Sequence, residues 1–432
     1  MNGTIQKFIR KNHDRLVTSI AFMPAIIAIL FLLFSWLMVE LVFSAIGKTI
    51  KTNHDWIRLK DASTARAILS AMVSGIISLT VFSFSMVMIL LNQAASQLSN
   101  RMLEGMIGNR FQQMVFGFYI ATIVYALFLL STIRDIESGI YAPALSIYLL
   151  LVLTVVDIFL FIYFLHYVTQ SVKFETIINR IHKQTIRSLD RKIDETKPVT
   201  DQAVMMNEYM INMSSSDYFQ GFDENGLLHY SVQHNGMIKF LHPTGTFLLR
   251  RTPLLVFYSN NKMEDETLQN LLFKVDCYSG QPIDKNPIYG YHQLAEVAIK
   301  ALSPGINDPE TAVLSLHALT DLFYYLLKHP LKSDYLDHEG RLRIQTANWT
   351  FEKLFKECYY PIWDYGKKDR YIQQALVSMI DQLKQNDVSK SEAAMLEDFG
   401  TMVKKEIDKL VIHSIEWASY RVFLHLPKVN FC

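Results

Sequence analysis

Four long apolar runs lie in the first 170 residues of the chain and predict four membrane-spanning helices. They cover residues 20–43, 67–91, 111–133 and 143–167, and about 20 apolar residues suffice to cross a hydrocarbon core of roughly 30 Å. Residues 171–432 instead mix charged and apolar residues as soluble proteins do. We therefore expect two domains: a transmembrane four-helix domain, residues 1–170, and a cytoplasmic α+β domain, residues 171–432.

The soluble half shows two kinds of pattern. Short alternating runs at about 222–260, such as GLLHYSVQHNGMIKFL, predict a β-rich patch. Amphipathic stretches with helical period fill residues 264–421 and predict helices. The expected fold class is therefore a membrane α-helical protein joined to a cytoplasmic α+β domain that is mostly helical with a small β-patch.

The second apolar run carries small and polar residues along one side, and we call this set the polar stripe. On a helix, positions seven apart lie nearly above one another, and a helix over residues 62–104 would measure about 60 Å. Because hydroxyl and amide groups are costly in hydrocarbon, the polar stripe is expected to face other protein or water. Its members are Ser70, Ser74, Ser78, Ser85, Asn92, Ser96 and Ser99.

Two interpretations of the polar stripe remain open. Small residues allow helices to pack closely, which is their commoner use in membranes. Alternatively, the stripe lines a water-filled path that copies of the same helix enclose in a symmetric homo-oligomer. The bulk of Asn92, and the continuation of the stripe past the bilayer, favour the path.

Asp157, inside the fourth apolar run, is the second candidate. Ionisable residues within membrane spans are rare and frequently serve as proton or cation sites. The competing interpretation is that the side chain hydrogen-bonds a Ser or Tyr of a neighbouring helix. The sequence does not choose between the two.

The string ALSPGINDPETA at residues 301–312 predicts a turn between two helices. The proline at its centre ends the first helix, the glycine supplies freedom for the turn, and the second proline suits a first helical position. Asn307 or Asp308 is expected to cap the second helix. A ligand or enzyme site at that helix N-terminus is the alternative, although an Asp cap would repel an anion. The turn residues are Ser303, Pro304, Gly305, Asn307, Asp308 and Pro309.

This string also resembles the hallmark of a bacterial family of predicted integral membrane proteins of unknown function. Two further segments, FSMVMILLNQAASQLSNRM and FLHYVTQSV, are similar to the family's segments after its second span and at the end of its fourth. The chain has His292 where the resemblance leads us to expect Arg. The resemblance implies the architecture described above and supplies no activity.

Composition excludes several functional classes. A net charge of +1 argues against a dedicated nucleic-acid-binding protein. The three cysteines are scattered and match neither a disulfide framework nor a zinc site. The chain contains no GxSxG, GxGxxG, P-loop or HExxH motif. We therefore expect no catalytic residue, no metal and no cofactor.

The Lys and Arg residues that flank the apolar runs favour a cytoplasmic location for both termini. We expect a multi-pass protein of the inner (plasma) membrane whose partners are the lipid bilayer and copies of itself, with an unknown ligand. The leading functional hypothesis is an oligomeric channel or transport-related protein, with the second span lining the path and the cytoplasmic domain regulating it. The alternatives are a membrane-anchored sensor or scaffold without permeation, and an enzyme with an unrecognised cytoplasmic site.

Overall fold

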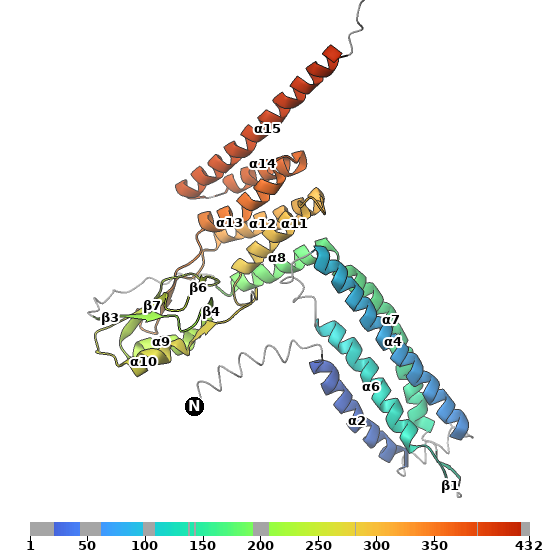
Figure 1. Cartoon of the computed structure of the whole chain (residues 1–432). Helices are drawn as coiled ribbons and strands as arrows, with labels where there is room; N and C mark the ends of the chain where they lie inside the picture. The colour runs from blue at the N-terminus through green and yellow to red at the C-terminus, as the bar shows by residue number, and fades with distance from the viewer. Residues whose placement is uncertain are drawn as a thin grey trace, which may run out of the picture. The chain divides into compact units, whose positions relative to one another are not determined.

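The chain forms two compact units, Met1–Lys173 and Phe174–Cys432 (Figure 1). The computed structural model describes residues 21–43, 62–97, 109–136, 139–141, 144–192, 207–280, 282–386 and 388–424. The first unit is built from apolar helices, and the second combines two sheets with a set of packed helices.

In the first unit, helix α6 is the central element. It packs against the three other helices that the structure describes in this unit, and α7 also packs against α2 and α4. Half of the apolar window of α6 is buried, compared with 22% for α4 and α7. Most of the surface of α4 and α7 is therefore left for lipid or for other protein. The elements are α2 (Phe22–Phe43), α4 (Ala62–Gln97), α6 (Arg110–Thr132), β1 (Arg134–Ile136), β2 (Gly139–Tyr141) and α7 (Ala144–Ser171).

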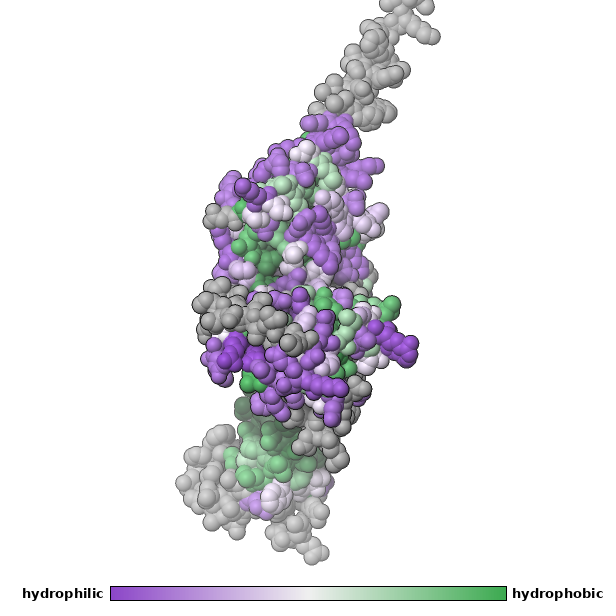
Figure 2. Space-filling model, turned by 90° about the vertical axis from the view of Figure 1, so that its left-hand side faces the viewer, coloured by the Kyte–Doolittle hydropathy of each residue, from purple (hydrophilic) through white to green (hydrophobic). Residues whose placement is uncertain are grey.

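Among the described residues, three helices are long and apolar enough to cross a membrane: Ala62–Ala95, Arg110–Thr132 and Leu145–Ser171. The first predicted span corresponds to α2, of which the stretch Phe22–Met38 is apolar. It is not among these three helices, so the first span stays a prediction. Figure 2 shows hydrophobic side chains gathered on the surface of this unit, while the surface of the second unit is mainly hydrophilic.

The second unit contains a five-stranded sheet and a three-stranded sheet. The larger sheet has the order β3 (Asn207–Asn212), β7 (Pro253–Ser259), β5 (Gly236–Phe240), β10 (Leu342–Gln345) and β9 (Asp334–Leu336). Only the β5–β10 pair is parallel. The smaller sheet has the order β6 (Phe247–Leu248), β4 (Asp217–Phe222) and β8 (Val275–Cys277). Buried aromatic side chains join the two sheets, and the rings of Phe219 and Phe240 stack 5.0 Å apart.

The predicted β-patch at 222–260 needs a correction. Residues 224–233, expected as a strand, form helix α9 (Glu224–Gln233), which begins where the Asp223 carboxylate accepts the Gly226 N–H at 3.1 Å. The stretch 264–421, expected to be helical, also contributes strands β8, β9 and β10. The β-region is larger than predicted because it recruits strands from distant parts of the chain, which local periodicity cannot show.

The helical part of the second unit surrounds the pair α11 (Ile288–Ala301) and α12 (Pro309–Lys328). Helix α8 (Phe174–Asp190) packs against both, and Gly290 permits the close approach, since a Cβ there would lie 1.7 Å from Thr185 Oγ1. The remaining helices are α10 (Asp265–Leu272), α13 (Phe351–Gly366), α14 (Arg370–Lys384) and α15 (Lys390–Leu424). Buried aromatic rings on α12, α13 and α15 stabilise this core.

Candidate functional site

The polar stripe points away from the rest of its own helical unit. The buried face of α4, which includes Leu69, Ile76 and Val87, belongs to the hydrophobic clusters shared with α6 and α7. At 100° per residue this face lies about 150° around the helix from the stripe. The stripe residues Ser70, Ser74, Ser78, Ser85 and Asn92 are all exposed.

The exposed side chains of the polar stripe find few partners in the same chain. Ser78 donates to the carbonyl oxygen of Ser74 at 2.8 Å. Ser70, Ser85 and Asn92 make no side-chain hydrogen bond with the residues that the structure describes. The side chain of Ser96 and the whole of Ser99 lie outside the described residues. Packing within one subunit therefore does not account for the stripe.

The exposed face of α4 that carries the polar stripe is wider in the N-terminal half of the helix than in the C-terminal half. In the N-terminal half, Ala67, Ala71 and Gly75 form a second exposed row beside the serines, and a Cβ on Gly75 would meet nothing within 4 Å. In the C-terminal half, large exposed side chains such as Val81 and Ile89 flank Ser85 and Asn92. The exposed face is therefore made of two rows of small residues in the N-terminal half of α4, and of a single row of polar residues in the C-terminal half.

Asp157 lies in the interior of the helical unit and not on the exposed face that carries the polar stripe. It is 1% exposed and faces Tyr119 and Thr122 of α6, while Ser83 of α4 lies beside Tyr119. Three atoms of this cluster have no hydrogen-bond partner among the described residues: Ser83 Oγ, Tyr119 Oη and Asp157 Oδ2. Because Ser83 belongs to the buried face of α4, the structure separates Asp157 from the polar stripe.

The turn at residues 301–312 is a structural junction between α11 and α12. Asp308 caps α12: its carboxylate accepts the Thr311 N–H at 3.1 Å and the Thr311 hydroxyl at 2.6 Å. Ser303 donates to the carbonyl oxygen of Lys300 at 2.7 Å. The residue with the special backbone conformation is Asn307, at φ 49°, and not Gly305 as the sequence suggested. The polar groups of the turn are used to join α11 to α12, which leaves little support for a ligand site there.

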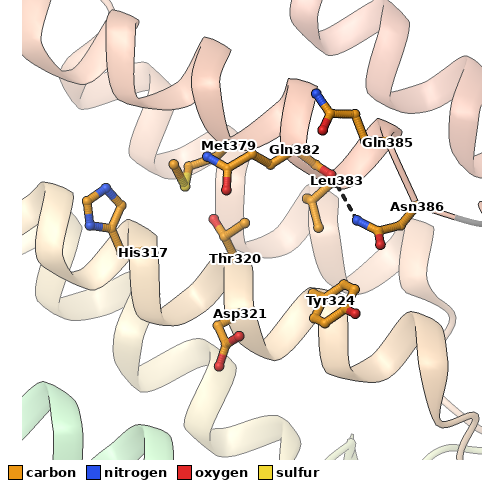
Figure 3. A pocket seen from close by; sticks show the side chains of 9 residues that line it. All are labelled: His317, Thr320, Asp321, Tyr324, Met379, Gln382, Leu383, Gln385 and Asn386. Carbon is orange, nitrogen blue, oxygen red and sulfur yellow. Dashed lines mark hydrogen bonds between the residues drawn. The ribbon is translucent and has the colours of Figure 1, made fainter.

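A groove of about 600 Å³ lies between α12 and α14 (Figure 3). Its acidic residue, Asp321, is 2.7 Å from His182 of α8, and the Thr320 hydroxyl lies 2.7 Å from the Tyr359 hydroxyl. Both side chains therefore hold helices together. Among the described residues, no group of three or more His, Cys, Asp or Glu side chains is placed to bind a metal ion.

Sequence reasoning did not identify which residues of the neighbouring helices lie beside Asp157. Ser83 and Tyr119 lie in apolar helices and carry no motif, so only the packing of α4, α6 and α7 brings them to Asp157. A weak signal existed for Ser83, because it is a serine of the second span that lies off the polar stripe.

Comparison with known proteins agrees with a membrane protein. Uncharacterized proteins of Mycobacterium tuberculosis and Mycobacterium bovis are each 22% identical over 344 residues, which is 77% of this chain and 66% of theirs. The chain thus spans just under two thirds of the length of these relatives. No solved structure matches the chain. The family model described as "Predicted membrane protein (DUF2254)" matches residues 17–382, and the chain therefore belongs to this family of predicted membrane proteins.

Proposed function

We propose that the protein is an oligomeric channel in which α4 helices from several copies surround a shared polar path. The observation that carries this proposal is the direction of the polar stripe, which faces away from α6 and α7 and is exposed over its described length. In an isolated subunit this face would meet lipid, where an unpaired hydroxyl or amide costs roughly 2–7 kcal/mol. Copies of the same helix would remove that cost.

The two rows of small residues support close contact between copies of α4. Ala67, Ala71 and Gly75 recur every four residues, and so do Ser70, Ser74 and Ser78 beside them. Such rows let helix backbones approach closely in membranes. The N-terminal half of α4 is thus suited to hold the copies together.

The C-terminal half of α4 is suited to border the path. Ser85 and Asn92 continue the stripe, and the exposed side chains of Val81 and Ile89 flank them. At 1.5 Å per residue, Asn92 lies about 20 Å from the middle of α4 along the helix axis. This distance exceeds half of a hydrocarbon core of roughly 30 Å. Asn92 would therefore lie at a mouth of the path and Ser85 within the membrane.

Conductance across planar bilayers tests this proposal. Purified wild-type protein is expected to conduct ions, and Ser85→Leu and Asn92→Leu are expected to reduce the single-channel conductance. Phe159→Leu is the matched control, because Phe159 is 69% exposed on α7, away from the stripe, and this substitution is expected to leave conductance unchanged. A wild-type protein that reconstitutes and never conducts would refute the channel.

A further inference from the structure

A cavity of about 320 Å³ lies in the second unit, where parts of the chain far apart in sequence meet. Its wall includes Lys192, which lies just after the end of α8, the middle of β4, Asn286 before α11, and residues next to β9 and β10. This volume falls at the lower end of the range of small-molecule sites, about 300–1,000 Å³. We call it the Lys192 cavity.

Ion pairs neutralise much of the charge in this wall. Arg191 pairs with Asp284 at 3.3 Å, and Lys332 pairs with Glu224 at 3.0 Å. The wall also holds Asp276 together with two lysines, Lys192 and Lys285. Neither lysine has an ion-pair partner among the described residues. The cavity therefore carries excess positive charge.

Lys192 is the more unusual of these two lysines. Burial, with a smaller effect from the neighbouring Arg191, lowers the pKa of Lys192 to about 8. Its backbone is fixed, because the Lys192 carbonyl oxygen accepts the Lys332 N–H at 2.8 Å and its N–H donates to Leu189 at 2.7 Å. A partly buried ammonium group without a counter-ion is costly, and such groups concentrate at functional sites.

Asn286 adds an unsatisfied donor to the same wall. It is fully buried, and its Oδ1 accepts the Ile288 N–H at 3.2 Å, while its Nδ2 has no partner. Gly245, at φ 92°, leaves space for this amide, since a Cβ there would lie 2.5 Å from Nδ2. A buried donor left unpaired costs about 1–3 kcal/mol.

Gln220, another amide of the wall, provides the contrast. Its Nε2 donates to the carbonyl oxygens of Tyr278 and Gly280 at 2.9 and 2.8 Å, and its Oε1 accepts the Tyr289 hydroxyl at 3.0 Å. The wall thus satisfies one buried amide completely and leaves Asn286 Nδ2 without an acceptor among the residues that the structure describes.

We propose that the Lys192 cavity binds a small oxyanion, an organic phosphate or carboxylate, whose oxygens interact with Lys192 and Asn286. Lysine binds such groups as a point charge. Lys192 follows α8, and only two residues separate the start of α8 from the end of α7, so the anion would contact the segment joined directly to the last span. This binding is independent of whether the membrane unit conducts ions.

Thermal unfolding of the full chain in detergent tests the proposal, with inorganic phosphate and acetate as probes at constant ionic strength. We expect a saturable rise in the unfolding temperature of the wild-type protein with at least one probe. The probe that causes the rise shows whether the cavity binds a phosphate or a carboxylate. Lys192→Met and Asn286→Asp should each weaken binding and raise the half-saturating concentration at least tenfold. Lys356→Met is the matched control, since Lys356 pairs with Glu352 on an exposed surface, and it should respond as wild type does.

If neither probe causes a saturable rise in the unfolding temperature of the wild-type protein, the proposal is overturned. It is also overturned if the wild-type protein and the three variants respond equally. Should Lys192→Met and Asn286→Asp fail to fold, amine labelling of the wild-type protein decides. The active probe should then protect Lys192 several-fold and leave Lys356 unprotected, whereas equal labelling of Lys192 with and without the probe would overturn the proposal.

Discussion

Substitution of Arg343 by Met is expected to destabilise the β9–β10 hairpin, which forms part of the wall of the Lys192 cavity. Arg343 Nε lies 2.7 Å from Asp337 Oδ2, and both side chains are about 95% buried. Arg343 also donates to the Gly236 carbonyl oxygen at 3.2 Å, which ties the hairpin to β5. Removing one partner of a buried ion pair leaves an uncompensated charge, so we expect a loss of about 3–5 kcal/mol.

The pH dependence of this loss follows from Asp337. Burial alone would raise the pKa of Asp337, but the Arg343 guanidinium and the N–H groups of Arg341 and Glu339 outweigh it and lower the pKa below 3.8. The pair therefore contributes fully at neutral pH, and its contribution is lost as the pH falls below about 4. The difference between wild type and Arg343→Met should shrink over that acidic range.

Hydrogen exchange of the full chain, read on peptides that cover residues 331–349, measures this effect. Arg341→Met is the matched control, because the Arg341–Glu339 pair is exposed and is expected to contribute less than about 1 kcal/mol. The double variant with Asp337→Asn, which carries no buried charge, should recover a large part of the loss. Equal losses for Arg343→Met and Arg341→Met, or no recovery in the double variant, would refute the reasoning.

Three further predictions follow from individual side chains. Tyr119→Phe removes a buried hydroxyl that has no partner, so thermal unfolding in detergent should show unchanged stability or a gain of up to about 1 kcal/mol; a clear loss would mean that the hydroxyl is engaged. Because the pKa of Lys192 falls from 10.5 to about 8 on folding, the unfolding temperature of the wild-type protein should rise as the pH increases from about 8 to 10.5, and Lys192→Met should lack this rise. Asp308→Ala removes the cap of α12 and should cost about 0.5–2 kcal/mol in a denaturant titration, whereas Asn307→Gly should cost nothing comparable, since Asn307 has a positive φ that glycine adopts freely.

The membrane helices and the turn at residues 301–312 could be predicted from the sequence because both depend on local patterns. Apolar length marked three helices that could span the membrane, and the N-cap preference identified Asp308. The same kind of reasoning failed at residues 224–233, where the apolar alternation predicted a strand and the structure forms α9 behind its N-cap Asp223. Local strand and helix signals conflicted there, and tertiary packing decided the outcome.

The direction of the polar stripe and the composition of the Lys192 cavity could not be predicted from the sequence. Periodicity places Ser78 and Ser85 on one face of α4, but only the packing of α6 and α7 shows that this face is the exposed one. Lys192 and Asn286 lie 94 positions apart and meet through the fold of the second unit. Such long-range neighbours leave no signal in a single sequence.

The access of water to the polar stripe tests the central claim most directly. Ser85→Cys and Asn92→Cys, in a background with Cys277→Ser and Cys432→Ser, would be treated with a membrane-impermeant thiol reagent in reconstituted vesicles, with Phe159→Cys on the exposed face of α7 as the control. The buried Cys358 serves as the internal unreactive thiol. Fast reaction of both stripe cysteines and no reaction of Phe159→Cys is the predicted result. Stripe cysteines as unreactive as Phe159→Cys would contradict a water-filled path along α4.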